Sequence, residues 1–269
     1  DADRMGAAID HSNADSVLLT GNQIGAMMMN YILMRHKDMG TLPANSAVVK
    51  TIVTTNLADM IAQSYGATVY NVLTGFKFIG EKIKEWEANG KHTFMFGYEE
   101  SFGYLSGTHA RDKDAVVSAM LFAEMACYYE SKNIKLYDVL QDLYKKFGYF
   151  VEVSESIAFG GINGMAEMKA VMDKLRSRPI NNIAGNPVLK FMDLQKGICK
   201  DIDGNESKID LPSTNVLKFM LSEDEWCCVR PSGTEPKLKI YVSVKGKTQE
   251  LAKSKNQDVL GFMKMLVNN

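Results

Sequence analysis

The stretch AVVKTIVTTNLADMIAQSYGATVYNVL, residues 47–73, decides the fold because its hydrophobic pattern changes from strand to helix and back to strand. Residues 47–54 are apolar and β-branched, as expected of a buried strand. Asn56 is suited to cap a helix over 57–65, and residues 67–73 return to the strand pattern. A strand, a helix and a strand in this order predict an α/β layered domain.

The alternation continues on both sides of this stretch. Before it, the apolar residues of 24–34 cover more than one helical face, which predicts a largely buried helix. After it, the pattern predicts an amphipathic helix over 78–86, a short strand over 93–96, and two further helices over 115–129 and 136–147. The first half of the chain is therefore expected to repeat strand, loop and helix.

The pattern changes at Gly148, where we expect a domain boundary. The second half combines several short strands with two helices. The expected strands cover 149–159, 188–194, 216–221, 225–229 and 238–244, and the expected helices cover 164–175 and 249–266. This order predicts a smaller α+β domain built on an antiparallel sheet.

Composition excludes several classes of protein. The 269 residues, 46% of them hydrophobic, can form two modest cores, and 31 basic against 32 acidic residues leave no broad field that would attract nucleic acid or an anionic membrane. No apolar run approaches the ~20 residues of a membrane span, and the N-terminus lacks the pattern of a secretion signal. The four cysteines lack metal-site spacing, so we expect reduced thiols in a cytoplasmic protein.

The segment RPSGTEPK, residues 230–237, joins two strand-like runs and is suited to hold a phosphate. Its first proline and Gly233 favour a tight turn in which backbone N–H groups converge, while Ser232 and Thr234 add hydroxyl donors. Arg230 supplies a planar fork that matches phosphate oxygens. An ordinary Pro-Gly turn with an arginine at its rim explains the same residues, so both interpretations stay open.

Two loops are expected where strands of the first domain end, at Thr74–Lys77 and Glu99–Ser101. In an open α/β sheet, loops at the carboxyl ends of strands form the ligand crevice. The carboxylates of Glu99 and Glu100 can accept hydrogen bonds from sugar hydroxyls, and Ser101 can donate or accept one. A pair of glutamates on a solvated surface is the alternative interpretation.

The segment HARDKD, residues 109–114, places five titratable side chains directly before an apolar helix. The start of a helix can bind an anion through its free N–H groups and its dipole. Lys113 is suited to stabilise a migrating phosphoryl group or to donate a proton, and it is a better candidate than His109. A helix cap made by Asp112 or Asp114 explains one of the acids without any chemistry.

The chain begins with the charged segment DADR, residues 1–4. Asp1 and Asp3 stand at alternate positions, from which a bent loop can direct both carboxylates to one Mg²⁺ ion. A solvated chain end is the alternative. Because the segment runs directly into an apolar stretch, we interpret the chain as a fragment of a longer protein.

Taken together and in this order, the motifs resemble the α-D-phosphohexomutase family, in particular its phosphoglucomutases and phosphomannomutases. Residues 1–4 are similar to the end of the family's Asp-x-Asp-x-Asp-Arg magnesium loop. Thr74–Lys77 and residues 97–101 are similar to its sugar-contacting segment and its specificity loop. Residues 109–114 resemble the charged segment after that loop, and 230–236 resemble the phosphate-binding loop of the fourth domain.

The resemblance implies three groups of site residues. The residues implied to bind the substrate are Thr74, Gly75, Glu99, Ser101, Arg230, Ser232, Gly233 and Thr234. Those implied in catalysis are Lys113, His109 and Arg4, and the implied magnesium ligands are Asp1 and Asp3.

The resemblance also implies domain limits. Residues 1–20 would end domain two with part of the metal loop, 21–147 would form the α/β sugar-recognition domain three, and 148–269 the α+β phosphate-binding domain four, with a TATA-binding-protein-like fold. Nothing in the sequence resembles the family's Thr-Ala-Ser-His-Asn-Pro loop, whose phosphorylated serine transfers the phosphoryl group. We therefore expect this chain to need the N-terminal domains of the same protein, and to be inactive alone.

The implied activity is that of a phosphoglucomutase in glucose metabolism. Such an enzyme interconverts glucose 1-phosphate and glucose 6-phosphate through a phosphoserine and a hexose 1,6-bisphosphate, with Mg²⁺ as cofactor. Phosphoryl transfer depends on charge neutralisation and in-line positioning, which agrees with a metal loop, a lysine and an arginine loop. Phosphomannomutase, phosphoglucosamine mutase and phosphopentomutase activities stay open, and so does a module that binds sugar phosphates without catalysis.

Overall fold

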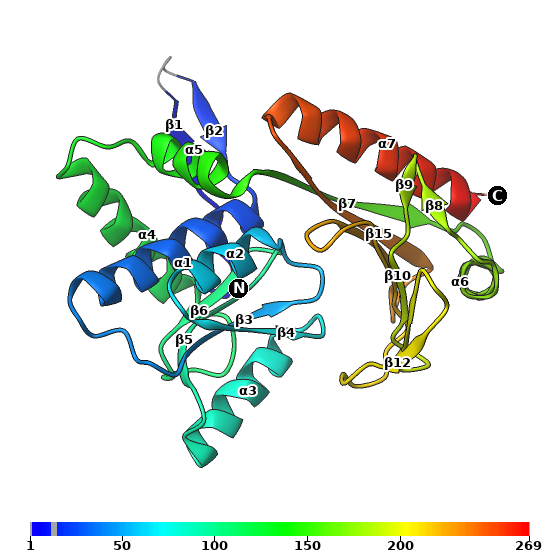
Figure 1. Ribbon diagram of the computed structural model, residues 1–269, viewed down its shortest axis with the longest axis horizontal. Helices are drawn as coiled ribbons and strands as arrows, with labels where there is room; N and C mark the ends of the chain where they lie inside the picture. The colour runs from blue at the N-terminus through cyan, green and yellow to red at the C-terminus, as the bar shows by residue number, and fades with distance from the viewer. Residues whose placement is uncertain (1, 12–14, 269) are drawn as a thin grey trace. The chain divides into compact units, whose positions relative to one another are not determined.

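The computed structural model describes residues 2–11 and 15–268. The chain divides into two compact units, Asp1–Phe147 and Gly148–Asn269. The first contains a mixed sheet with helices, and the second contains an antiparallel sheet with two helices among the described residues (Figure 1). The expected fold class, an α/β domain followed by a smaller α+β domain, is confirmed.

The sheet of the first unit has the strand order β4-β3-β5-β6. Its strands are β3 (Ser46–Thr51), β4 (Thr68–Val72), β5 (Thr93–Glu99) and β6 (Gly103–Ser106). Strand β3 is parallel to both β4 and β5, whereas β6 returns antiparallel to β5. From β3 the chain first adds β4 on one side and then crosses to add β5 on the other side. The direction in which strands are added therefore reverses between β3 and β5. The carboxyl ends of these two strands mark the usual ligand crevice of such sheets.

Helices cover both faces of this sheet (Figure 1). They are α1 (Gly21–Asp38), α2 (Leu57–Ser64), α3 (Phe76–Asn89), α4 (Ala115–Glu130) and α5 (Leu136–Phe147). Alternate residues of β3 face opposite ways, so Ala47 and Val49 pack with Ile79 and Ile83 of α3. Helices α1 and α2 lie on the other side of the strands (Figure 1). A small hairpin, β1 (Ala8–Asp10) and β2 (Ser16–Leu18), precedes α1.

The sheet of the second unit is antiparallel throughout, in the order β12-β11-β10-β13-β14-β15-β7. Its strands are β7 (Tyr149–Ala158), β10 (Lys190–Asp193), β11 (Ile198–Asp201), β12 (Glu206–Lys208), β13 (Leu217–Met220), β14 (Trp226–Pro231) and β15 (Lys237–Gly246). One face packs against α6 (Gly164–Ser177) and α7 (Gln249–Asn268), where Met172 and Val259 meet Leu217 and Ile240 in a buried core. A two-residue-per-strand hairpin, β8 (Asn182–Ile183) with β9 (Asn186–Pro187), follows α6.

Two local predictions are wrong. The side chain of Asn56 makes no capping hydrogen bond to α2; instead Thr55 Oγ1 accepts one from the N–H of Leu57 at 3.1 Å. The Asn56 amide oxygen accepts a hydrogen bond from the Lys50 amine at 3.5 Å. The strand predicted over 93–96 continues to Glu99, so only residues 100–102 turn before β6. Glu99 therefore belongs to a buried strand end and not to a solvated loop.

Cys127, Cys199, Cys227 and Cys228 are free thiols. In residues 2–11 and 15–268, no helix combines the length and the apolar character needed to cross a bilayer.

Candidate functional site

A hydrogen bond joins the end of β5 to the loop after β4 at the carboxyl edge of the first sheet. Glu99 ends β5, and Gly75 lies between β4 and α3. The N–H of Gly75 donates to Glu99 Oε1 at 2.8 Å, and Glu99 is only 7% exposed. Gly75 has φ 117°, a value that a residue with a side chain rarely adopts. The structure therefore brings Thr74 and Gly75 beside Glu99, although they are distant in sequence.

The turn after β5 is held from two sides. Thr51, at the end of β3, donates a hydrogen bond from Oγ1 to Glu100 Oε2 at 3.5 Å and shares a 2.8 Å hydrogen bond with Thr54. On the other side, Gly21 at the start of α1 approaches so closely that an added Cβ would lie 2.1 Å from the backbone oxygen of Glu100. Half-buried Ser101 is the next residue of this clamped turn, so its position is set by contacts of its neighbour.

Asp114 caps α4, which settles one alternative for the charged segment 109–114. Its Oδ1 accepts hydrogen bonds from the N–H groups of Val116 and Val117 at 2.9 and 3.0 Å. Its Oδ2 lies 3.0 Å from His109 Nε2. The contact with His109 and these backbone N–H groups hold the pKa of Asp114 below its ordinary value. The helix start already carries a carboxylate, which disfavours a second anion there.

Lys113 points to the N-terminal segment of the chain. Its Nζ lies 3.1 Å from Asp3 Oδ2 and 3.1 Å from Asp112 Oδ1. Burial would lower the pKa of Lys113, but hydrogen bonds to the Asp112 and Asp3 carboxylates outweigh it and the pKa is raised. The hydrogen bond from Lys113 also lowers the pKa of Asp3, with a smaller effect from the neighbouring charge of Arg4. The structure thus joins an implied metal ligand to an implied catalytic lysine.

The described residues contain one of the two implied magnesium ligands. The Asp3 carboxylate is a hard oxygen donor of the kind that Mg²⁺ prefers, and Lys113 now pairs with it, whereas Asp1 lies outside the described residues. Within residues 2–11 and 15–268, no group of three or more His, Cys, Asp or Glu side chains could hold a metal ion. Exposed Arg4 follows Asp3 directly.

In the second unit, residues 232–236 form the turn between β14 and β15. Ser232 Oγ accepts hydrogen bonds from the N–H groups of Thr234 and Glu235 at 3.4 and 3.3 Å, so these N–H groups do not point freely at a ligand as the sequence suggested. Gly233 and Thr234 are exposed at the tip. Arg230 lies in β14 before the turn, and its guanidinium donates to Tyr241 Oη at 3.4 Å. The turn remains an exposed, arginine-flanked loop.

Two family models match the chain, one after the other. Residues 20–147 match "phosphoglucomutase/phosphomannomutase, alpha/beta/alpha domain III", and residues 166–259 match "phosphoglucomutase/phosphomannomutase, C-terminal domain". The chain belongs to the phosphoglucomutase/phosphomannomutase family. The two matched domains occur in the same order as the two compact units of the structure.

Curated relatives of this family member are named phosphoglucomutase. The chain is 34% identical over 245 residues to one of Staphylococcus saprophyticus and 36% identical over 245 residues to one of Staphylococcus epidermidis. In both comparisons the match covers 91% of this chain and 44% of the relative. The chain therefore spans less than half the length of these relatives.

Solved structures with the same fold have lower sequence identity. Parafusin of Paramecium, a phosphoglucomutase in an open form, aligns with a TM-score of 0.60 at 18% identity, covering 100% of this chain and 43% of its own. An N-acetylphosphoglucosamine mutase of Aspergillus fumigatus, in complex with GlcNAc-6P and magnesium, aligns with a TM-score of 0.50 at 12% identity over 98% of this chain and 47% of its own. A variant of that mutase with one serine replaced by alanine contains glucose 1,6-bisphosphate and aligns with a TM-score of 0.51 at 13% identity, covering 99% of this chain and 46% of its own.

Sequence reasoning missed the residues that hold the site together. Thr51, Thr54 and Gly21 had no assigned role, yet they fix the turn at Glu100. The available signal was the position of Thr51 at the end of a parallel strand, where ligand crevices form. Gly21 carried no comparable signal because its importance depends on a backbone 79 residues away.

Proposed function

We propose that this chain is the sugar-recognition and phosphate-binding part of a phosphoglucomutase-type enzyme. The enzyme would interconvert glucose 1-phosphate and glucose 6-phosphate through a phosphoserine and a hexose 1,6-bisphosphate. The observation that carries the proposal is the contact between Glu99 and Gly75, since it joins two segments that resemble the family's sugar-contacting segment and specificity loop. The curated relatives named phosphoglucomutase support the choice of glucose.

The residues fit this reaction in separate roles. Glu99 Oε1 is occupied by the Gly75 N–H, so its other oxygen would accept a sugar hydroxyl, next to Thr74 and Ser101. Lys113 would neutralise charge on the transferred phosphoryl group. His109, in the same segment as Lys113, and Arg4, next to Asp3, would assist it in catalysis. The phosphate that is not transferred would be bound by Arg230, Ser232, Gly233 and Thr234.

Magnesium would be held by Asp3 together with Asp1. When bound, the ion would neutralise developing negative charge on the phosphoryl oxygens. The Aspergillus mutase structures with magnesium and with glucose 1,6-bisphosphate support the choice of both small molecules. The ammonium group of Lys113 lies 3.1 Å from Asp3 Oδ2 and would compete with the ion for this carboxylate.

We infer that residues 1–20 end domain two, residues 21–147 form domain three and residues 148–269 form domain four. The parent protein would be cytoplasmic. It would be a phosphoprotein, because the reaction requires a phosphorylated serine in its N-terminal domains. This chain carries no segment like the serine loop, so we expect it to bind sugar phosphates without turning them over.

Calorimetric titration tests the proposal. The chain should bind glucose 6-phosphate more tightly than mannose 6-phosphate or ribose 5-phosphate, and Arg230→Ala should weaken binding by roughly tenfold or more, as expected for a charged hydrogen bond of about 1.5–3 kcal/mol. The exposed Lys190→Ala serves as the control and should leave affinity unchanged. Equal affinity of the Arg230→Ala variant would contradict the phosphate role of the loop.

An activity assay tests whether this chain catalyses the reaction by itself. The chain is incubated with glucose 1-phosphate, Mg²⁺ and catalytic glucose 1,6-bisphosphate, and glucose 6-phosphate is measured. We expect none above background. Isomerised product from this chain alone would show that the phosphoryl donor is not the missing serine loop. A preference for mannose 6-phosphate in the titration would favour phosphomannomutase instead.

A further inference from the structure

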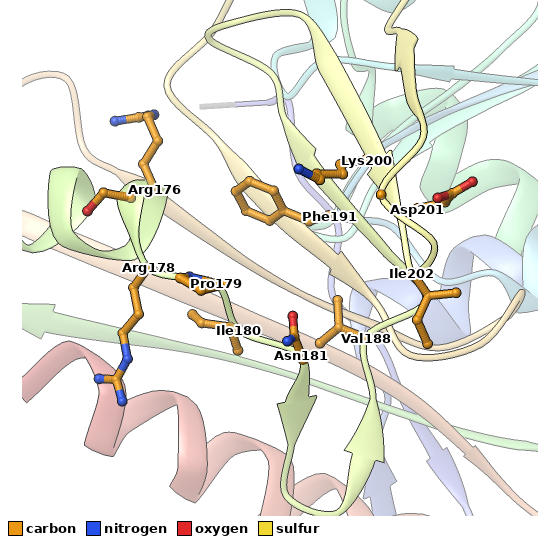
Figure 2. Close-up of a pocket in the computed structure, with 12 residues that line it drawn as sticks. Arg176, Arg178, Pro179, Ile180, Asn181, Val188, Phe191, Lys200, Asp201 and Ile202 are labelled. Carbon is orange, nitrogen blue, oxygen red and sulfur yellow. The ribbon is translucent and has the colours of Figure 1, made fainter.

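The second unit contains a cavity that the proposed function does not use. It has a volume of ≈ 400 Å³ and lies between the end of α6, the segment before β8, and strands β10 and β11. Figure 2 shows Pro179, Ile180, Val188 and Phe191 around it, with Ile202 at its edge. Volumes of 300–1,000 Å³ lined mainly by apolar groups are typical of small-molecule sites.

Arg176 lines the cavity, but its guanidinium group is committed elsewhere. Nε donates to Asp193 Oδ2 at 3.0 Å, and the second terminal nitrogen donates to Asn215 Oδ1 at 2.7 Å. The remaining nitrogen pairs with Asp173 at 3.3 Å. Asp193 is buried, so this arrangement neutralises a buried charge and fixes the end of α6. Arg176 is thus part of the wall and supplies no free cation.

Asp201 is committed in the same way. Its carboxylate accepts hydrogen bonds from the N–H groups of Asp203 and Asn205 at 3.0 and 2.8 Å, and from the Asn205 amide at 3.0 Å. The hydrogen bond from the Asn205 side chain, with those from the backbone, lowers the pKa of Asp201. Its carboxylate points away from Phe191 in Figure 2. The acid therefore stabilises the turn after β11 and does not face the apolar lining.

Lys200 is the cation that remains available at the cavity among the labelled residues of Figure 2. Its amine extends to the side of the Phe191 ring, whereas the guanidinium of Arg178 extends away from the cavity (Figure 2). Lys200 pairs with Glu206 at 3.9 Å, and both side chains are more than half exposed, so this pair holds the amine only weakly. The carbonyl end of α6 disfavours an anion on the opposite wall. Charge complementarity thus places a negative group at Lys200.

We propose that this cavity binds a small molecule with an apolar ring and one carboxylate. The ring lies against Phe191, Ile180 and Val188, and the carboxylate pairs with the Lys200 amine. The cavity lining includes no residue of the turn at 230–236, so the two sites can be tested separately.

Three probes that differ by one feature test the proposal by NMR of the ¹⁵N-labelled chain. 3-Phenylpropionate carries ring and charge, 3-phenylpropan-1-ol carries the ring alone, and acetate carries the charge alone. We expect 3-phenylpropionate to shift the amide signals of Ile180, Phe191 and Ile202 with the highest affinity of the three. Because an exposed ion pair contributes up to about 1 kcal/mol, Lys200→Gln should weaken its binding by roughly three- to fivefold and remove the preference over the alcohol.

The exposed Lys190→Gln, on the neighbouring strand and outside the cavity lining, is the matched control and should bind like the wild type. Ile202→Ser tests the apolar wall without unfolding the chain, since Ile202 is 60% exposed, and it should weaken all ring-containing probes. The proposal is overturned if 3-phenylpropionate shifts no signals of the cavity at millimolar concentration, if the alcohol binds equally well, or if Lys200→Gln leaves the preference intact.

Discussion

The backbone N–H of Gly75 donates a 2.8 Å hydrogen bond to Glu99 Oε1. This contact ties the start of α3 to the end of β5, so the loop after β4 and the turn after β5 keep a fixed distance. The hydrogen bond uses Oε1, and we propose that the other oxygen of the buried Glu99 carboxylate accepts a sugar hydroxyl. Glu99 thus has a structural role in this contact and a proposed binding role, and substitutions can separate the two.

Glu99→Gln and Glu99→Ala should differ in stability. Glutamine keeps a carbonyl oxygen for the Gly75 N–H, whereas alanine leaves this half-buried N–H at the start of α3 without its acceptor. We expect Glu99→Ala to lower the free energy of unfolding of the first unit by about 1–3 kcal/mol, and Glu99→Gln to lower it by less. Urea unfolding measures the free energy of unfolding of each variant. Hydrogen exchange of the Gly75 amide measures the loss of its hydrogen bond.

Both variants should lose affinity for glucose 6-phosphate, because each removes the charged acceptor proposed for a sugar hydroxyl. If Glu99→Gln bound glucose 6-phosphate as well as the wild type, the carboxylate would be only a structural tie. That result would leave the fold intact and remove Glu99 from the proposed site.

Gly21→Ala should destabilise the first unit. The new methyl group would lie 2.1 Å from the backbone oxygen of Glu100, whose side chain is also held by Thr51. Overpacking of this kind costs about 1–3 kcal/mol. Gly6→Ala is the control in the same unit, since nothing lies within 4 Å of its Cβ position. Similar melting temperatures of the two variants would contradict the tight clamp on the turn.

Sequence patterns predicted those elements whose burial is regular. The helix α5 begins and ends where the pattern placed it, because Val139, Leu140 and Leu143 recur on one buried face. Strand β12 had no such signal, since Glu206–Lys208 are all exposed. The last residues of β5 were missed for another reason: Gly97 looks like a strand end, yet it is needed there because a side chain would lie 2.7 Å from Ile79.

The candidate site was predictable as a set of residue types at strand ends, but not as a set of contacts. Thr74–Lys77 and Glu99 could be identified as site candidates because the sequence places them where strands end. It could not indicate that Lys113 meets Asp3, because that contact joins residues 110 positions apart. Turn chemistry likewise suggested free N–H groups at 230–237, whereas the Ser232 hydroxyl already accepts from two of them.

Asp114 should make the start of α4 sensitive to acid. Its pKa is lower in the folded chain than in the unfolded chain, so its stabilising contribution is complete above about pH 4 and is lost as the pH falls through the folded-state pKa. Asp114→Asn keeps an oxygen that can cap the helix but removes this pH dependence. Asp114→Ala removes both and should cost about 1 kcal/mol at pH 7.

Hydrogen exchange of the Val116 and Val117 amides at pH 7 and at low pH is the direct measurement. The wild type should lose protection on acidification, Asp114→Asn should change little, and Asp114→Ala should lack protection at both values. Equal acid sensitivity in the wild type and Asp114→Asn would assign the effect to another carboxylate.

Lys113→Met should raise the pKa of Asp3 toward its ordinary value, because the hydrogen bond from Lys113 is the main cause of its depression. The Asp3 carboxylate would then be protonated at a higher pH. In the wild type its ionised form stabilises the fold above the unfolded-state pKa, and this contribution would be smaller in the variant. Carboxyl ¹³C chemical shifts measured against pH report this directly. Lys82→Met is the matched control, since Lys82 lowers the pKa of Glu85 through a similar 2.8 Å contact and should affect that residue alone. An unchanged Asp3 titration in Lys113→Met would mean that the lysine does not hold the carboxylate in solution.

The same variant also tests the metal proposal. With the competing ammonium removed and the carboxylate still ionised at pH 7, Mg²⁺ should perturb the Asp3 signal at a lower concentration than in the wild type.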